Sequence, residues 1–177
     1  MSDLTLQDSF LEFCKKNKFE INDQQVKIIN LLDKFINSKK SLFNFFPTVK
    51  NKLCFYLYGN VGIGKTMLLD FFYSELKIRK LRLHFNQFMI NFHDYKHKKT
   101  NNNSIESYVK YLKKRYELIY LDEFQVTNIV DAMILGKLFE VIFSEKIKII
   151  ITTNTKLNEL YKDGLQREQF LPFISII

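Results

Sequence analysis

The stretch GNVGIGKT at residues 59–66 decides the fold of this chain. It follows an apolar run at residues 53–58 and leads into another at 67–72, an order that predicts a buried strand, a glycine-rich loop and a helix. The glycines let backbone N–H groups converge on one point, and the start of the helix adds the positive end of its dipole. The stretch therefore predicts a phosphate site, because the strand and helix around it disfavour the alternative of a glycine-rich turn without a ligand.

The spacing G-x-x-x-x-G-K-[ST] assigns roles to the residues at the end of this loop. Lys65 is expected to reach the β- and γ-phosphates of a nucleotide as a point charge. The Thr66 hydroxyl is expected to ligate a Mg²⁺ ion that keeps most of its waters. The residues predicted to bind the nucleotide are Gly59, Asn60, Val61, Gly62, Ile63, Gly64, Lys65 and Thr66.

A second informative stretch is ELIYLDE at residues 117–123, an apolar strand pattern that ends in two carboxylates. Ligands of open parallel sheets collect at the carboxyl ends of the strands, so Asp122 and the phosphate loop are expected to meet there. We expect Asp122 to hold Mg²⁺ through its water shell and Glu123 to activate the attacking water. A solvated acidic turn is the alternative when this stretch is taken alone.

The interval from Lys65 to Asp122 is 57 residues (122 − 65), which leaves room for an extra strand between the two nucleotide-binding strands. That strand and the Glu beside the Asp favour ATPases over GTPases. The other strands are predicted at residues 81–85 and 147–152. Helices are predicted at residues 5–16, 23–37, 66–76, 87–92, 104–115 and 127–144, with Ser104 as a cap and with Ile129, Met133, Leu135, Leu138, Phe139 and Ile142 mostly inward.

Two stretches are expected to lack regular structure: the polar break at 38–41 that precedes Pro47, and the Asn- and Lys-rich residues 93–103. The basic cluster of residues 93–103 could contact phosphates of a nucleic acid or a lipid, or it could be a solvated loop. We divide the chain into a helical segment at residues 1–50, expected to pack over the nucleotide site, and a nucleotide-binding core at residues 51–177.

Length, composition and charge limit which class of protein this chain can belong to. The 177 residues are 46% hydrophobic, enough for a full core. The net charge of +8 suits an anionic macromolecular partner, or it reflects a chain-wide bias towards Lys. No motif indicates a disulfide or a zinc site, and neither a leader nor a membrane span is visible. Cys54 is expected to be a small buried hydrophobe in its strand, and we expect a cytoplasmic protein.

Two polar residues near the end of the chain are candidates for the site. Asn154 follows the predicted strand at 147–152, where it could sense the γ-phosphate or position water, or could instead cap the next helix. Arg167 follows a glycine turn, where it could complete a neighbouring subunit's site or form a surface ion pair. The sequence leaves both alternatives open.

Beyond these motifs, the chain resembles the ZapE-type cell-division ATPases of bacteria and their mitochondrial AFG-like relatives. The runs DEFQVT at 122–127 and LYKDGLQR at 160–167 carry the resemblance most specifically, because other ATPase branches do not share them. The matching runs are YLYGNVGIGKTMLLDFFY at 56–73, RLHFNQFM at 82–89, LDEFQVTNIVDAMILGKLFE at 121–140, TTN at 152–154 and LYKDGLQREQFLPFI at 160–174.

The resemblance implies a P-loop NTPase of the AAA+ (ASCE) type, a three-layer α/β/α fold with a parallel sheet. It implies ATP and Mg²⁺ as cofactors, a homo-oligomer with sites completed in trans, and a protein partner such as the division ring at the inner membrane. The catalytic residues would be Glu123, Lys65, Asn154 as a sensor and Arg167 as an arginine finger. Gln25 is similar to a family glutamine, for which contact with adenine is our hypothesis.

The chain also departs from the family pattern. Asn60 and Ile63 stand where the family usually has Gly and Arg, in variable positions of the loop, and Asn128 replaces a usual Asp. The segment 152–158 lacks the common Arg and Pro. Family members continue past residue 174 into a last strand and a helical lid, so we expect the C-terminal lid to be missing here.

Three functions are compatible with these features. The first is an ATPase that acts on protein partners, with peripheral membrane contact at most. The second is a helicase-loader-like ATPase that binds single-stranded nucleic acid, which the charge would permit. The third is a nucleotide-binding module without turnover, which the expected lack of a lid would explain.

Overall fold

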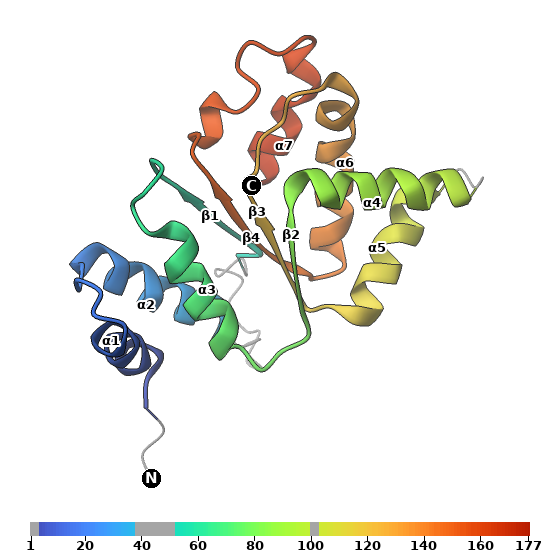
Figure 1. Cartoon of the computed structure of the whole chain (residues 1–177). Coiled ribbons are helices and arrows are strands. Elements are labelled where there is room, and N and C mark those ends of the chain that lie inside the picture. The colour runs from blue at the N-terminus through green and yellow to red at the C-terminus, as the bar shows by residue number, and fades with distance from the viewer. Residues whose placement is uncertain (1–3, 38–51, 100–102) are drawn as a thin grey trace, which may run out of the picture. The chain divides into compact units, whose positions relative to one another are not determined.

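The computed structural model describes residues 4–37, 52–99 and 103–177, so the predicted breaks at 38–41 and at Pro47 lie outside the described residues. This part of the chain contains four strands and seven α-helices, with at least one helix after each strand (Figure 1). The strands are β1 (Cys54–Tyr58), β2 (Lys80–His84), β3 (Leu118–Asp122) and β4 (Lys148–Thr153). The helices are α1 (Leu6–Lys16), α2 (Asp23–Asn37), α3 (Lys65–Glu75), α4 (Phe85–Lys98), α5 (Ser104–Arg115), α6 (Ile129–Ser144) and α7 (Leu171–Ile176).

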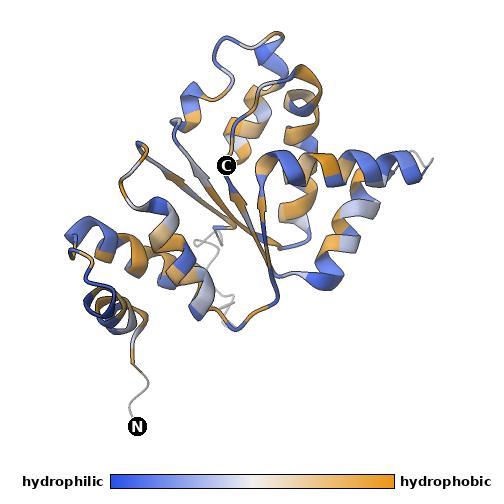
Figure 2. Cartoon of the chain, viewed as in Figure 1, coloured by the Kyte–Doolittle hydropathy of each residue, from blue (hydrophilic) through white to orange (hydrophobic). Residues whose placement is uncertain are grey.

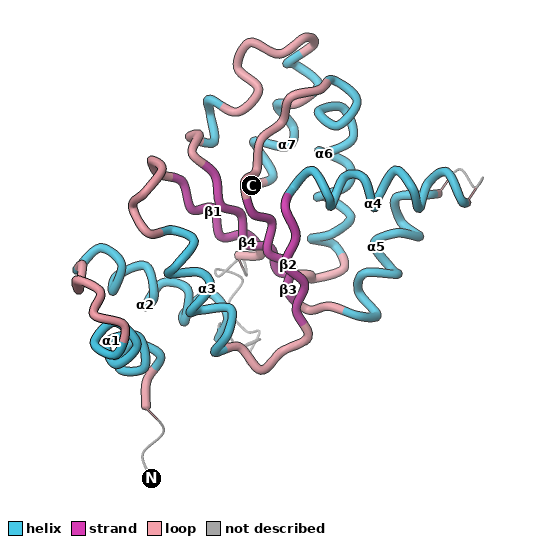
Figure 3. The backbone as a smooth tube through the Cα atoms, viewed as in Figure 1, coloured by secondary structure: helices cyan, strands magenta, loops and turns pink. Residues whose placement is uncertain are grey.

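The four strands form one parallel sheet in the order β1-β4-β3-β2, as the magenta arrangement in Figure 3 shows. The strand that lies between β1 and β3 is β4, whereas β2, which comes between them in sequence, pairs with the far side of β3. An extra strand therefore separates the two predicted nucleotide-binding strands. All four carboxyl ends lie at the same edge of the sheet because every pair is parallel.

The chain folds into two compact units. The first contains α1, α2 and α3, and the second contains the sheet with α4 to α7. The boundary crosses the glycine-rich loop, with residues 59–63 in the second unit and Gly64 in the first. The division into residues 1–50 and 51–177 stays a prediction.

In the first unit, the amphipathic helices α1 and α2 pack with α3, and α1 does so through aromatic side chains. A capping box starts α1, in which the Asp8 amide donates to the Thr5 hydroxyl over 3.2 Å and the Thr5 amide donates to the Asp8 carboxylate over 3.3 Å. The ring of Phe71 on α3 lies 5.2 Å from Phe10 and 5.0 Å from Phe13. Helical spacing of these apolar residues thus gives α1 an apolar face that packs on α3.

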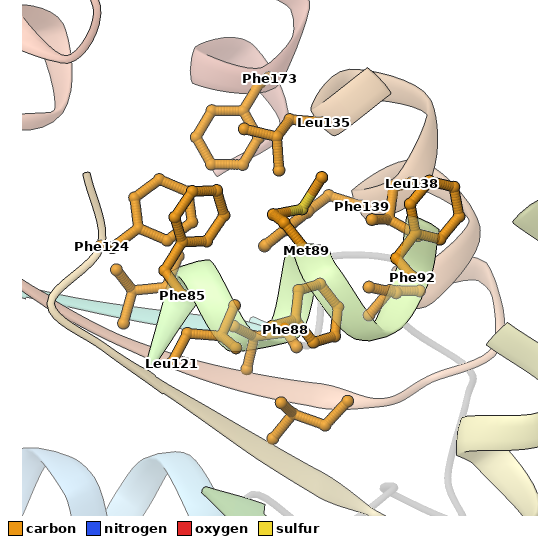
Figure 4. Close-up of a cluster of buried hydrophobic side chains, with 14 of the residues drawn as sticks. Phe85, Phe88, Met89, Phe92, Leu121, Phe124, Leu135, Leu138, Phe139 and Phe173 are labelled. Carbon is orange, nitrogen blue, oxygen red and sulfur yellow. The ribbon is translucent and has the colours of Figure 1, made fainter. Parts of the chain in front are cut away.

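In the second unit, α4 to α7 cover one face of the sheet. Ile119 and Leu121 of β3 alternate with Leu118 and Tyr120, so that every second side chain enters the cluster beneath these helices. Figure 4 shows the aromatic rings and leucines of this cluster meeting between α4, α6 and α7. In Figure 2 the strands and α6 are coloured mainly as hydrophobic, which suits elements buried on several sides.

Half-buried Cys54 joins this cluster from β1, and burial raises the pKa of its thiol to about 12. The thiol therefore stays protonated at neutral pH. This agrees with the prediction that Cys54 acts as a small hydrophobe rather than as a nucleophile or ligand.

Three details of the prediction are wrong. The helix expected at 87–92 is α4, which continues to Lys98, so most of the expected loop at 93–103 is helical. Tyr95 explains the extension, because its ring packs 5.2 Å from Tyr108 of α5. Ser104 is the first residue of α5 rather than its cap, which is Asn103. Met133 is 49% exposed because it lies on the outer side of α6.

The departure at Asn128 has a structural role. Its side-chain oxygen accepts a 2.8 Å hydrogen bond from the amide of Asp131 and so caps the start of α6. Asp131 also contacts His93 of α4, with 2.8 Å between Nε2 and Oδ1. The three side chains link α4 to α6, and an Asn at position 128 preserves the cap that an Asp would provide.

The core contacts of α6 make a first prediction. Phe139 is fully buried and its ring centroid lies 4.9 Å from that of Phe173, so Phe139→Ala should lower the free energy of unfolding by about 3–5 kcal/mol. Exposed Met133 on the same helix provides the control, and Met133→Ala should change it by about 0.5 kcal/mol or less. Urea denaturation measures both, and equal losses would contradict the assignment of the core.

Candidate functional site

The glycine-rich loop joins the end of β1 to the start of α3. Gly62 and Gly64 have φ angles of 85° and 81°, a left-handed conformation that side chains with a Cβ rarely adopt. Gly64 is the N-cap of α3 and has no side chain to bond the first N–H groups of the helix. The hydrophobic side chain of Val61 is 82% exposed at the tip of the loop. The left-handed conformation of Gly62 and Gly64 directs backbone N–H groups as a phosphate site requires.

Gln25 of α2 lies against this loop within the first unit. A Cβ placed on Gly64 would lie 2.6 Å from Nε2 of Gln25, so the two residues are in close contact. The close approach gives a second reason for glycine at position 64. Gln25 therefore lies beside Gly64, the N-cap of α3. The contact of Gln25 with adenine stays a prediction.

Asp122 ends β3 as a buried carboxylate, 7% exposed, whose two oxygens are both engaged. Oδ1 accepts hydrogen bonds from the Thr152 hydroxyl of β4 and, over 3.1 Å, from the amide of Glu123. Oδ2 lies 3.0 Å from Nη2 of Arg82 on β2. Burial by itself would raise the pKa of Asp122, but the bonds from Thr152 and Arg82 outweigh it and hold that pKa below its ordinary value.

These partners leave limited room for a metal. Oδ1 of Asp122 accepts from Thr152 and Glu123, Oδ2 lies against Arg82, and Tyr120 is a further hydrogen-bonding partner of this carboxylate. A carboxylate with so many partners suits a hydrogen bond from a water of Mg²⁺ better than direct ligation by both oxygens. The donor set therefore fits the predicted role of Asp122 as a ligand that acts through water.

Arg82 was not predicted from the sequence. Its guanidinium lies 4.9 Å from the ring centroid of Tyr120, its register partner on β3, and from there reaches Asp122. The signal was present in the alternation KLRLH of β2, in which Leu81 and Leu83 pack against the core cluster and Arg82 takes the opposite face. A charged residue facing away from the core next to a strand that ends in Asp is a candidate partner for it.

Glu123 follows Asp122 in a left-handed conformation, with φ of 52°. This conformation is uncommon for a residue with a Cβ, and such residues gather at functional sites. The amide of Phe124 donates to the carbonyl of Thr152 over 2.8 Å, which fixes the turn. The Glu123 side chain is 80% exposed, and its Oε2 lies 3.5 Å from Nδ1 of His84 at the end of β2. Glu123 is thus turned towards solvent, as a water-activating residue requires.

Asn154 directly follows β4 and is exposed. The Thr153 hydroxyl donates to the carbonyl of Phe124 over 2.7 Å, and the Tyr56 hydroxyl donates to the carbonyl of Thr155 over 2.8 Å. These bonds fix the segment around Asn154 at the sheet edge where β3 ends. The alternative of a cap is wrong, because the next helical turn, Leu157–Glu159, has Lys156 at its N-cap.

Arg167 begins the helical turn Arg167–Gln169 and is half-buried. Its Nη2 donates to the backbone carbonyl of Asn158 over 2.7 Å. Among residues 4–37, 52–99 and 103–177 it forms no ion pair, so the surface ion pair considered for it is not found there. The role of Arg167 as a finger stays a prediction.

The structure thus brings several predicted site residues to one edge of the second unit. Residues 59–63, Asp122, Glu123 and Asn154 follow the carboxyl ends of β1, β3 and β4, where parallel sheets bind their ligands. Lys65, Thr66 and Gln25 belong to the first unit, within which Gln25 contacts Gly64.

Comparison with known proteins gives a consistent result. A family model described as AFG1-like ATPase matches residues 9–177. Lactation elevated protein 1 homolog B of Danio rerio is 43% identical over 136 residues, which cover 70% of this chain and 27% of that protein. Cell division protein ZapE of Escherichia coli K12 is 40% identical over 124 residues, which cover 69% and 33%. The chain spans about a third or less of the length of these relatives.

Solved structures confirm the predicted fold class. The crystal structure of DnaI has a TM-score of 0.57 at 19% identity, covering 90% of this chain and 82% of that one. AMPPCP-bound DnaA from Aquifex aeolicus has a TM-score of 0.59 at 18% identity, covering 90% and 47%. The fold is therefore that of the P-loop AAA+ ATPases. In the described residues, no helix combines the length and hydrophobicity needed to cross a bilayer.

The Asp122 contacts make a second prediction. Arg82→Gln removes the cation beside a buried carboxylate and should lower the free energy of unfolding at pH 7 by about 1–3 kcal/mol. The lowered pKa of Asp122 means that the contribution of Arg82 is present above pH ~4 and is lost as the pH falls through the folded-state pKa. Urea denaturation across this pH range measures the difference.

The control is Arg79→Gln, made one residue before the start of β2. Arg79 pairs with Glu117 over 3.3 Å, but both side chains are about half exposed, and such exposed pairs contribute little. If Arg82→Gln is as stable as Arg79→Gln at pH 7, then the guanidinium of Arg82 does not stabilise the Asp122 carboxylate.

Proposed function

Because this chain belongs to the AFG1-like ATPase family, we propose that it binds ATP with Mg²⁺ at residues 59–66 and hydrolyses it to ADP and phosphate. The observation that supports this most is the left-handed pair Gly62 and Gly64, which leads into α3 without a side-chain cap. A loop of this kind directs N–H groups and the helix dipole at an anion. The carboxylates at the end of β3 supply the second half of such a site.

Each residue contributes to one part of the reaction. Backbone N–H groups of residues 59–64 bind and orient the phosphates, and Lys65 adds a positive charge at the β- and γ-phosphates. Thr66 and Asp122 would hold Mg²⁺, Asp122 through a water of the ion. Mg²⁺, when bound, would neutralise negative charge on the β- and γ-phosphates as the bond to the γ-phosphate breaks.

Glu123 and Asn154 act on the attacking water in this proposal. The carboxylate of Glu123 accepts a proton from the water, and His84, 3.5 Å from that carboxylate, limits its orientation. Asn154 has a side-chain amide that can donate to the γ-phosphate or accept from the water, and the bonds of Thr153 and Thr155 fix its position. If the chain instead binds nucleotide without hydrolysing it, the third function considered above, then Glu123 has no role in catalysis.

The biological context is also proposed. One relative is named a cell division protein, and on that name we propose a role in cell division. A protein partner and a cytoplasmic location with peripheral contact at the inner membrane are further proposals. We further propose a homo-oligomer in which Arg167 completes the site of the next subunit. Because the relatives extend far beyond the matched region, these roles concern the activity of the longer proteins as well as this chain.

The assignment of the site makes a third prediction. Lys65→Ala should abolish binding of a fluorescent ATP analogue, because it removes the charge at the phosphates. Glu123→Gln should retain binding but lower the rate of hydrolysis by about 10²–10⁴-fold, the usual contribution of a general base. Exposed Glu12 on α1 is the control, and Glu12→Gln should leave both quantities unchanged.

Two results would contradict these roles. Tight nucleotide binding by Lys65→Ala would show that residues 59–66 are not the phosphate site. An equal rate of hydrolysis in Glu123→Gln and the unaltered chain would show that Glu123 is not the base, and a rate of zero in both would support the module without turnover.

The role proposed for Arg167 makes a fourth prediction. Arg167→Ala and Glu123→Gln should each be inactive alone, because each lacks one half of every site. In an equal mixture, about one quarter of sites would join an intact Glu123 to an intact Arg167 of the neighbour, so activity should return. Steady-state ATP hydrolysis across mixing ratios measures this return, and mixtures that stay inactive would place Arg167 in its own subunit's site or outside the site.

A further inference from the structure

A second candidate site lies in the second unit, between the C-terminal half of α4, helix α5 and strand β2. An open cavity of about 380 Å³ is found there, a size at the lower end of ligand pockets (about 300–1,000 Å³). None of its lining residues belongs to the phosphate loop or to the DE pair at 122–123. The lining residues are Leu81, Leu83, Asn91, Asp94, Tyr95, Lys98, Tyr108, Tyr111, Leu112 and Tyr116.

Tyrosine rings dominate this cavity. The ring of Tyr95 lies 5.2 Å from Tyr108 and 5.7 Å from Tyr111, so three rings from two helices form one cluster. Tyr108 is buried and fixes the cluster, whereas Tyr111 is 41% exposed and presents its ring to solvent. The Tyr95 ring is tilted by 57° against Tyr108 and by 44° against Tyr111, so the exposed part of the Tyr111 ring is the surface on which an aromatic ligand can stack.

Positive charge surrounds the rings. Cζ of Arg115 lies 4.0 Å from the ring centroid of Tyr111, and Nζ of Lys99 lies 5.0 Å from that of Tyr95. Residues 94–117 contain seven Lys and Arg against three Asp and Glu, a net charge of +4, which is half of the +8 of the whole chain. In Figure 2 the C-terminal part of α4 and much of α5 are coloured as hydrophilic. Cations are thus concentrated around the exposed ring of Tyr111 and the half-buried ring of Tyr95.

We infer that this α4–α5 face, defined by Tyr95, Tyr111, Lys98, Lys99 and Arg115, binds single-stranded nucleic acid. Proteins that bind single strands combine a basic surface for the phosphates with aromatic rings on which bases stack. Unpaired bases can reach recessed rings, whereas the bases of a duplex are stacked within it. Asn91 and Asp94 in the lining supply hydrogen-bonding groups for a base edge.

The combination of groups disfavours other anionic partners. An acidic peptide would pair with the lysines but would make no use of the exposed part of the Tyr111 ring. A membrane surface would require exposed apolar side chains beside the cations, whereas the lining residues Leu81 and Leu83 are half-buried and Leu112 is buried. Nucleobases and phosphates together match both features of the α4–α5 face.

The test uses a fluorescent 20-nucleotide oligo-dT and anisotropy without ATP, so its outcome does not depend on nucleotide hydrolysis. Tyr111→Leu should weaken binding by roughly 5- to 150-fold, the effect of losing one stacked base, without changing the salt dependence. Arg115→Gln should reduce the slope of log affinity against log salt by about 0.7, the value for one phosphate contact. Tyr111→Phe keeps the ring and should bind as the unaltered chain does.

Matched controls lie in the first unit. Phe19→Leu removes another exposed aromatic ring, 44% exposed, and Lys16→Gln removes another exposed cation. Both should bind the oligonucleotide normally. The proposal is overturned if the unaltered chain does not bind the oligonucleotide at 50 mM salt, where the Debye length is about 15 Å. It is overturned as well if the control substitutions weaken binding as much as the substitutions in the α4–α5 face do. It is also overturned if a duplex, poly-glutamate or anionic vesicles compete as well as the single strand does.

Discussion

A carboxylate buried at the end of the central sheet constrains the strands on both sides of it. Removing Asp122 from water is costly unless its charge is paired and its oxygens accept hydrogen bonds. Thr152 of β4 and Arg82 of β2 meet this requirement, so one side chain fixes how the ends of three strands are arranged. The turn at Glu123 follows directly, since its amide also binds Asp122. The chemistry of the sheet edge and the stability of the sheet therefore depend on the same contacts.

A second constraint acts at the glycine-rich loop. The left-handed angles of Gly62 and Gly64 exclude most other residues, and the approach of Gln25 excludes a Cβ at position 64 on its own account. Of the two departures, Ile63 lies between these glycines and is 53% exposed, and Asn60 precedes them and is also exposed. Side chains at positions 60 and 63 are therefore compatible with the loop conformation that Gly62 and Gly64 set.

Aromatic rings pack among aliphatic side chains on the face of the sheet that is covered by α4 to α7. Phe124 stacks on Phe173 with a centroid distance of 5.4 Å, and Phe85 lies 4.2 Å from Phe124 (Figure 4). Phe124 follows the DE pair directly, so the core anchors the turn that presents Glu123. Rigid packing below a site is one way for a protein to keep a strained residue in position.

Local sequence patterns were sufficient to predict the phosphate loop, the strand that ends in Asp122 and the parallel α/β class, because each depends on residues close together in the chain. They also located most helices, within a few residues. The folded chain was needed to find that Arg82 pairs with Asp122, that α4 continues through Tyr95, that Met133 faces outward and that four tyrosines share a cavity. These features depend on contacts between residues far apart in sequence, whose geometry follows from strand order and helix packing rather than from any local pattern.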